Sequence, residues 1–228
     1  MPSTGRTMME DLLPSKVASV EVLEDDPAAS LFPEEAAQFG WAVESRTREF
    51  TTARSCARRA LTKLGLAAAP ILRGPKREPL WPPGVVGSIT HCRGYRAAAV
   101  ALKSDLWSIG IDAEVHDELP PGVPDHVLIE HETAWLLNAP AGIHWDRAVF
   151  SAKESVFKAW FPLTRRWLGF EDVAVTFHPT NGTFDARLLV AAPVIRGRAL
   201  TGFSGRFLVR HGLVLTATAV LRSHHFAQ

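Results

Sequence analysis

The chain has 228 residues, of which 46% are hydrophobic and 21% charged, so it can form one large globular domain or two small fused ones. A formal net charge of +1 excludes a globally basic nucleic-acid-binding protein, although it leaves room for a local basic patch. No apolar run approaches the roughly 20 residues of a membrane-spanning helix, and two cysteines in a chain of this size are typical of a reducing compartment. Because no charged-then-apolar leader is visible, we expect a cytoplasmic protein without membrane contact.

The first part of the chain predicts a strand and two helices. Residues 1–14 are polar and interrupted by proline, so we expect them to be mobile. Alternating apolar and polar residues predict a strand over 16–25. Pro33, followed by two acidic residues, predicts the start of a helix. Residues 44–66 have one apolar side and Gly65 near their end, which predicts a longer helix.

The middle of the chain predicts extended structure. Residues 69–92 are rich in proline and glycine and indicate an extended connection. The segments 95–102 and 106–115 are typical of strands, and the short polar turn between them predicts a hairpin. Residues 116–126 resemble a linker loop.

The last part predicts helices followed by strands. Two helices are expected over 125–140 and 146–160, the second with Asp146 as its N-cap. Strands separated by turn residues follow, with a tight hairpin connection at 210–212; the expected strands are 171–179, 183–191, 205–212 and 213–221. This order of elements indicates an α+β fold with two α+β halves.

Two acidic residues fall within the predicted strand 106–115. Strand side chains alternate between faces, so Asp112 and Glu114 point the same way, roughly 7 Å apart. Two carboxylates on one face repel each other unless a cation lies between them, and oxygen ligands suit Mg²⁺. The alternative is an ordinary solvent-facing strand surface.

A second polar pair falls on the predicted helix 146–160. Glu154 and Lys158 are four residues apart and share one face. An exposed ion pair would have the same spacing, but Phe150, Phe157 and Trp160 surround this one. A charged pair among aromatic residues indicates a site or a buried ion pair.

Together the two motifs resemble the signatures of the 4′-phosphopantetheinyl transferases. The first is Ile109-Gly110-Ile111-Asp112, and the second is Phe150-Ser151-x-Lys153-Glu154-Ser155-x-x-Lys158. The chain length is similar to that of the large class, in which two similar halves are related by pseudo-twofold symmetry. The resemblance implies the α+β fold of that family, with halves at 15–105 and 106–228 and an active site between them.

The resemblance also implies a reaction. Members of the family move phosphopantetheine from coenzyme A to a serine of apo acyl or peptidyl carrier proteins and release 3′,5′-ADP, for polyketide, nonribosomal peptide, siderophore or fatty-acid synthesis. By similarity, Asp112, Glu114 and Glu154 hold Mg²⁺, with Mn²⁺ as the alternative ion. Glu154 acts as the base, Lys158 stabilises developing charge, and Asp112 completes the catalytic set. The internal pseudodimer implies a monomer.

Coenzyme A carries a diphosphate and a 3′-phosphate and therefore needs cations. The contacts that the resemblance implies are Arg46, Arg54, Arg73, Lys76, Ser88, Thr90, His91, Asp112, Lys153, Lys158 and Trp167. Two readings stay open for the segment 165–170. Its aromatic residues line the pantetheine arm while its arginines face the acidic carrier, or the aromatics are core and the arginines form an exposed loop.

Two other classes of protein compete with the enzyme. A catalytically silent module could keep the fold and bind coenzyme A or a nucleotide, but the presence of all the motif carboxylates and of Lys158 favours chemistry. A nucleic-acid-binding protein could use the basic helix 46–63. The near-neutral total charge and the absence of a nucleic-acid-binding motif disfavour it.

Overall fold

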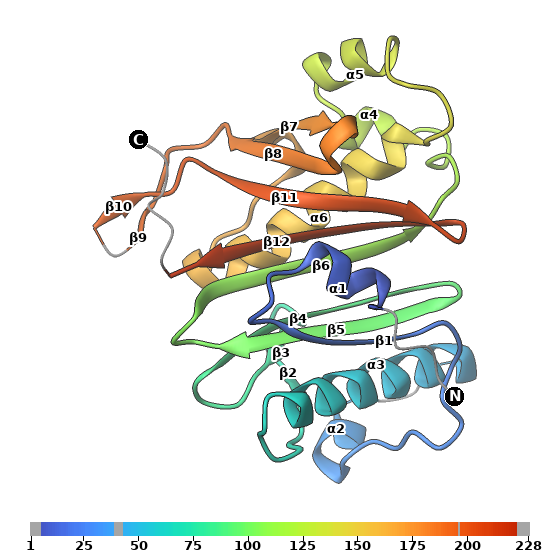
Figure 1. Cartoon of the computed structure of the whole chain (residues 1–228), viewed down its shortest axis with the longest axis vertical. Helices are drawn as coiled ribbons and strands as arrows, with labels where there is room; N and C mark the ends of the chain where they lie inside the picture. Colours follow the sequence, from blue (N-terminus) through green and yellow to red (C-terminus); the bar gives the residue numbers. More distant parts are fainter. Residues whose placement is uncertain (1–5, 39–42, 196, 223–228) are drawn as a thin grey trace.

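The structure is a computed structural model that describes residues 6–38, 43–195 and 197–222. Figure 1 shows two β-sheets stacked along the long axis of the molecule, with a long helix packed against each. Helices and strands mix along the chain without a regular βαβ alternation, which confirms the predicted α+β class. Among the described residues, none of the helices is both long and apolar enough to cross a membrane.

The smaller sheet is antiparallel with the strand order β1-β5-β4. Its strands are β1 (Ala18–Val22), β4 (Val85–Cys92) and β5 (Tyr95–Leu102). Helix α3 (Glu44–Lys63) covers β1 and β5 with a face of small buried residues that includes Ala57 and Ala60, so that helix and sheet approach closely. The short helix α2 (Pro33–Ala37) precedes it, with proline at its first position as predicted.

The larger sheet is also antiparallel, with the strand order β6-β12-β11-β8-β7. Its strands are β6 (Leu106–Val115), β7 (Val173–His178), β8 (Thr183–Leu188), β11 (Gly202–Arg210) and β12 (Leu213–Leu221). The hairpin predicted at 210–212 is confirmed, because His211 (φ 54°) and Gly212 (φ 71°) form a two-residue turn of left-handed conformation.

Helix α6 (Trp145–Thr164) packs across β6 and β12 and carries the second motif. A side chain at Gly110 of β6 would place its Cβ 1.8 Å from the Ser155 carbonyl oxygen of this helix. Glycine at this position therefore lets the strand of one motif touch the helix of the other.

The remaining elements are short. Apart from α1, which is described below, they are β2 (Leu72–Arg73), β3 (Pro79–Leu80), α4 (Pro124–Val127), α5 (Glu130–Leu136), η1 (Phe170–Asp172), η2 (Pro179–Asn181), β9 (Val194–Ile195) and β10 (Arg198–Ala199). The predicted N-cap role of Asp146 is wrong, because the helix begins at Trp145 with His144 as its N-cap. The Asp146 carboxylate instead accepts a hydrogen bond of 2.7 Å from the backbone N–H of Leu119 and fixes the preceding loop.

The predicted hairpin between 95–102 and 106–115 is also wrong. Strand β6 belongs to the larger sheet and pairs with β12, although almost the whole C-terminal half of the chain separates the two strands in sequence. It lies beside β4, where the side-chain oxygens of Ser88 and Thr90 accept hydrogen bonds from the backbone N–H groups of Ile111 (3.1 Å) and Ala113 (3.0 Å). Side-chain hydroxyls thus take the place of a backbone ladder between the two sheets.

The expectation of a mobile N-terminus is wrong for residues 6–14, and residues 1–5 lie outside the described residues. Helix α1 (Met8–Leu12) begins with a capping box between Thr7 and Glu10. Its Met9 is fully buried, and the Glu21 carboxylate accepts hydrogen bonds from the backbone N–H groups of Met8 (2.9 Å) and Met9 (2.8 Å). Apolar side chains one turn apart therefore tie this helix to the core.

Candidate active site

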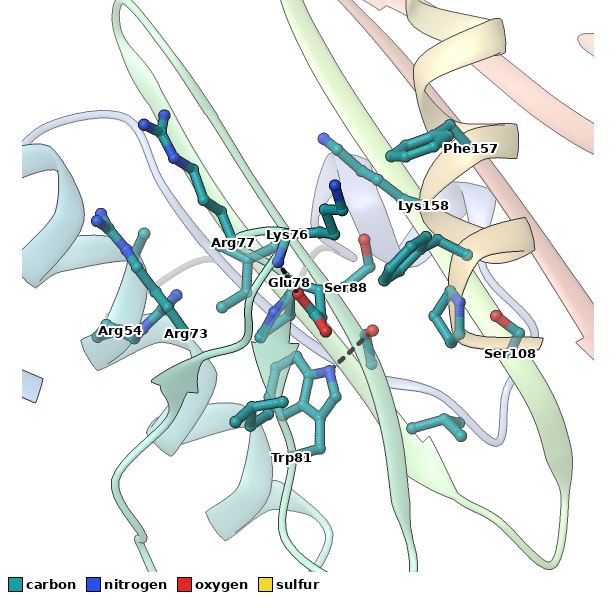
Figure 2. A pocket seen from close by; sticks show the side chains of 18 of the residues that line it. Arg54, Arg73, Lys76, Arg77, Glu78, Trp81, Ser88, Ser108, Phe157 and Lys158 are labelled. Atoms are coloured by element: carbon teal, nitrogen blue, oxygen red, sulfur yellow. Dashed lines mark hydrogen bonds between the residues drawn. The ribbon is translucent and has the colours of Figure 1, made fainter. Parts of the chain in front are cut away.

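A pocket of about 1210 Å³ lies between α3, the β3–β4 region and α6. The residues that line it come from two parts of the chain, 43–103 and 107–165. The β2–β3 hairpin closes one side, with two-residue strands Leu72–Arg73 and Pro79–Leu80. The lining is rich in basic side chains, namely Arg46, Arg54, Arg73, Lys76, Arg77, His91, Lys103, Lys158 and Arg165. In Figure 2, Lys158 extends from α6 toward the side of the pocket where Arg54, Arg73 and Arg77 lie. Such a concentration of cations suits a polyanionic ligand.

Arg54 is the most deeply buried of these cations, with 5% of its surface exposed. Its guanidinium lies 4.4 Å from the centre of the Phe50 ring, and Arg73 lies 4.3 Å from the same ring. Burial lowers the pKa of Arg54 to about 10, so the side chain stays charged at neutral pH. Among the described residues its Nε has no hydrogen-bond partner, which leaves a buried donor beside the pocket. Arg58, one turn further on, is instead held by Glu35 at 2.7 Å.

His91 enters the pocket from the end of β4. Its Nδ1 lies 3.7 Å from a carboxylate oxygen of Glu49, and Arg96 holds the other oxygen of that carboxylate at 3.2 Å. Burial lowers the pKa of His91 below its usual value, while the Glu49 carboxylate acts in the opposite direction. The imidazole is thus poised so that a nearby anion would favour its protonated form.

The β2–β3 hairpin carries an acidic side chain, Glu78, as well as basic ones. Glu78 accepts a hydrogen bond of 2.9 Å from the backbone N–H of Lys76, and its other oxygen pairs with Arg165 at 3.2 Å. A Cβ at Gly74 would lie 2.3 Å from the carboxylate carbon of Glu78, so glycine makes room for this side chain to fold back over the turn. Glu78 thereby ties the hairpin, including Arg77 at φ 66°, to the end of α6.

The first motif places Asp112 next to the second. Asp112 is buried, and its Oδ1 accepts hydrogen bonds from the Lys158 Nζ (2.7 Å) and from the Thr90 hydroxyl (3.3 Å). Its Oδ2 is buried and has no hydrogen-bond partner among the described residues. An orphaned carboxylate oxygen of this kind is a potential ligand position for a cation.

The other two motif carboxylates are electrostatically coupled to Asp112. Burial and the charge of Asp112 together raise the pKa of Glu114 to about 7, against the opposing charge of Arg147 at 3.1 Å. Burial also raises the pKa of Glu154, with Lys158 lowering it and Asp112 raising it. Within the described ranges, no three His, Cys, Asp or Glu side chains lie close enough together to hold an ion as they stand.

Most of the expected coenzyme A contacts line the pocket, but some do not. Arg46, Arg54, Arg73, Lys76, Ser88, His91 and Lys158 all line the pocket, together with Glu154. Thr90, Asp112 and Glu114 are absent from its lining, although Asp112 reaches it through Lys158. Trp167 is absent as well and leaves 76% of its surface in solvent.

Lys153 differs most clearly from its expected role as a coenzyme A contact. It is 2% exposed, and its Nζ contacts Glu132 (2.7 Å) and the carbonyl oxygens of Val127 (2.7 Å) and Phe170 (2.8 Å). The expected contact with coenzyme A is therefore wrong in this structure. Its partners belong to α4, α5 and η1, and none of these three elements lines the pocket.

Some pocket residues were not expected from the sequence. They are Arg77, Glu78, Trp81, Lys103 and Arg165. The indole N–H of Trp81 donates a 3.0 Å hydrogen bond to the Gly87 carbonyl oxygen, and a Cβ at Gly87 would lie 2.7 Å from the ring. The Lys-Arg-Glu run at 76–78 was a usable signal for the hairpin, whereas Lys103 and Arg165 become neighbours only through the fold.

Models of known protein families match the sequence over most of the chain. The family model for the 4′-phosphopantetheinyl transferase N-terminal domain matches residues 34–101, and the model for the 4′-phosphopantetheinyl transferase superfamily matches residues 108–193. The two matched segments adjoin the pocket from its two sides.

Curated relatives agree with the family models. The chain is 51% identical to 4′-phosphopantetheinyl transferase Svp of Streptomyces mobaraensis, over 93% of this chain and 89% of the relative. It is 47% identical to 4′-phosphopantetheinyl transferase PptT of Mycobacterium tuberculosis, over 94% and 98%. It is also 47% identical to 4′-phosphopantetheinyl transferase Npt of Nocardia iowensis, over 93% and 99%. The chain therefore belongs to the 4′-phosphopantetheinyl transferase family and has its α+β fold.

Proposed function

We propose that this protein transfers 4′-phosphopantetheine from coenzyme A to a serine of apo acyl or peptidyl carrier proteins and releases 3′,5′-ADP. The observation that carries the proposal is the contact of Lys158 with Asp112, at 2.7 Å, on the edge of a pocket lined by basic side chains. It brings the two motifs together at the place where a polyanionic substrate would lie. Membership of the family supports the reaction class.

Coenzyme A fits the chemistry of the pocket. The cations on α3 and the hairpin, chiefly Arg46, Arg54, Arg73 and Lys76, would bind its phosphates. His91 and Ser88 on β4 would add hydrogen bonds, with Lys158 reaching the diphosphate from α6. Arginine and lysine are the usual partners of phosphate oxygens.

Lys153 is left out of the proposed coenzyme A contacts, because Glu132 and two carbonyl oxygens already hold its ammonium group.

A divalent cation, Mg²⁺ or Mn²⁺, would be held by Asp112, Glu114 and Glu154. The residues fit such an ion chemically, because Asp112 has a buried oxygen without a hydrogen-bond partner in the described part of the chain, and its charge raises the pKa of both Glu114 and Glu154. When bound, the ion would neutralise charge on the diphosphate. The pairing of Glu114 with Arg147 and of Asp112 with Lys158 compensates these carboxylates in its absence.

In the proposed reaction, Glu154 accepts the proton of the carrier serine. Burial raises its pKa toward neutrality, which improves a carboxylate as a general base. The serine oxygen then bonds to the β-phosphorus of coenzyme A, the bond from that phosphorus to the bridging oxygen breaks, and 3′,5′-ADP leaves with the electron pair. Lys158 stabilises the negative charge that develops on the phosphoryl oxygens.

The proposal extends to the organisation of the chain. We take residues 15–105 and 106–228 as the two halves, with the active site between them, and a cytoplasmic monomer as the working form. The carrier supplies the only protein partner that the reaction needs. Nucleic acid and membrane have no part in the proposed function.

The test is to incubate the purified protein with coenzyme A, Mg²⁺ and an apo carrier protein and to weigh the carrier by mass spectrometry. A mass gain of one phosphopantetheine group, lost when the metal is chelated, is the expected result. Coenzyme A binding without transfer to several carriers would indicate the silent binding module. Absence of coenzyme A binding would contradict the proposal as a whole.

A further inference from the structure

The segment that follows α6 places an exposed aromatic side chain next to the pocket. Trp167 leaves 76% of its surface in solvent, while one side of its ring packs on Phe157 with the ring centres 5.1 Å apart. Phe157 lines the pocket directly beside Lys158 in the sequence. The exposed tryptophan therefore sits one side chain away from the catalytic motif.

The exposure does not result from a loose loop. Arg165 ends α6 in the left-handed conformation, and its backbone N–H donates a 2.8 Å hydrogen bond to the Phe161 carbonyl oxygen. The Arg166 carbonyl oxygen accepts a 2.9 Å hydrogen bond from the Trp160 indole, and Leu168 is buried. The backbone is thus fixed on both sides of Trp167 and holds its ring outward.

Positive charge surrounds this tryptophan. Arg165 and Arg166 precede it, and all three side chains are exposed. Arg165 is engaged with Glu78 of the hairpin, whereas Arg166 makes no ion pair among the described residues. The guanidinium of Arg166 lies 5.8 Å from the centre of the Trp160 ring, so this arginine is positioned while its charge stays unneutralised by a carboxylate of the described residues. A fixed tryptophan beside such an arginine is the composition typical of binding hot spots at protein interfaces.

We propose that Arg166 and Trp167 form the docking point for the carrier protein. This inference rests on the proposed function, because a carrier serine must approach Glu154 and would bring its protein surface over the mouth of the pocket. Carrier proteins are acidic, so their charge complements Arg166. A second copy of this chain is a poorer occupant, because a symmetric contact at this point would bring arginines together.

Steady-state kinetics with coenzyme A and an apo carrier protein, each varied separately, test the proposal in the full chain. Trp167→Ala and Arg166→Glu should each raise the KM for the carrier about tenfold or more, while the KM for coenzyme A stays within about twofold. Arg166→Glu should also weaken the salt dependence of kcat/KM for the carrier.

Matched controls come from exposed residues elsewhere. Leu137, which is 83% exposed at the end of α5, controls for loss of an apolar side chain as Leu137→Ala. Arg206→Glu controls for reversal of a charge. Arg206 is exposed on β11, and its neighbour Phe207 faces the core shared with α6, so Arg206 lies on the opposite face of the sheet. Both should leave both KM values at the wild-type level, and thermal unfolding should show that all four variants fold.

The results separate the possibilities. If Trp167→Ala raises the KM for coenzyme A and leaves that for the carrier unchanged, the ring serves the pantetheine arm and the docking proposal is overturned. Unchanged KM values for both substrates in Trp167→Ala and Arg166→Glu overturn it as well. If the wild-type protein transfers nothing, the proposed function fails and this inference with it, a result distinct from the other two.

Discussion

The Nζ of Lys158 lies 2.7 Å from the Oδ1 of Asp112, so the cation of the helical motif neutralises the carboxylate of the strand motif. The same Nζ also donates a 3.1 Å hydrogen bond to the Ile111 carbonyl oxygen. Lys158 is thereby held at the strand that carries the acidic residues, with its side chain still lining the pocket. One residue both compensates a buried charge and offers a cation to the substrate.

Replacing Lys158 by alanine should lower kcat by about 100- to 1,000-fold, because a fixed cation aimed at developing negative charge is lost. The same change leaves Oδ1 of Asp112 without its cationic partner, so Mg²⁺ should raise the melting temperature of the variant at least as much as that of the wild type. Kinetics and thermal shift with added Mg²⁺ measure the two effects. Lys16→Ala, which removes the surface pair with Asp105, is the control; equal kinetics in the two variants would contradict the role of Lys158.

Glu154→Gln should reduce transfer by about 100- to 10,000-fold, because the amide cannot take up the serine proton. The change preserves side-chain size and removes a buried charge, so folding should be spared. Intact-mass analysis of the carrier measures transfer, and circular dichroism measures the fold. Turnover close to that of the wild type would refute Glu154 as the base.

Arg54→Ala should weaken coenzyme A binding by about tenfold or more, because a charge-assisted hydrogen bond to phosphate is lost from a buried position. Isothermal titration calorimetry measures the dissociation constant directly. Arg48→Ala is a matched control on the same helix, since that arginine is exposed and pairs with Glu44. An unchanged dissociation constant in Arg54→Ala would exclude this contact.

Coenzyme A should bind more tightly as the pH falls from about 7.5 to 6. Burial keeps the pKa of His91 below its usual 6.5 in the free protein, so the ring is neutral at pH 7.5. A bound phosphate favours the imidazolium and raises this pKa, so binding takes up a proton and is stronger at lower pH. Calorimetry in buffers of different ionisation enthalpy measures the proton uptake.

His91→Gln is the control for that experiment. The phosphates of coenzyme A titrate equally with both proteins, so the difference between wild type and variant reports on His91 alone. Proton uptake should be smaller in the variant, and the same uptake in both would show that His91 does not titrate on binding.

Lys153→Met should destabilise the protein by about 3–5 kcal/mol, because it leaves the carboxylate of Glu132 buried without its partner. Coenzyme A affinity of the folded variant should stay within about twofold of the wild type. Adding Glu132→Gln should recover part of the lost stability. Chemical denaturation measures the first effect and calorimetry the second; a large loss of affinity with unchanged stability would restore Lys153 to the coenzyme A contacts.

The sequence predicts the parts of the site that lie within one element. Asp112 and Glu114 share a strand face, and Glu154 and Lys158 share a helix face, because both relations depend on local periodicity. Local sequence patterns also predict the α+β class, the long helix α3 and the hairpin at His211.

What the sequence does not predict depends on contacts between distant segments. The pairing of β6 with β12 overrides the short turn after β5, because β12 offers β6 a full antiparallel ladder. The burial of Lys153 depends on Glu132 and on the Phe170 carbonyl oxygen, which the fold brings together from separate elements. Residues 6–14 become ordered because Glu21 of β1 holds the first turn of α1.

The hydroxyl of Thr90 accepts a hydrogen bond from the backbone N–H of Ala113 and donates one to the Asp112 carboxylate. The same oxygen atom therefore contributes to the contact between the two sheets and to the acidic site. A shear of one sheet against the other would therefore rotate the Asp112 carboxylate with it. Valine, which matches threonine in shape, would remove both hydrogen bonds and leave Ser88 to hold the strand and Lys158 to hold the carboxylate. Thr90 therefore links the alignment of the two sheets to the orientation of the Asp112 carboxylate, and the two should change together.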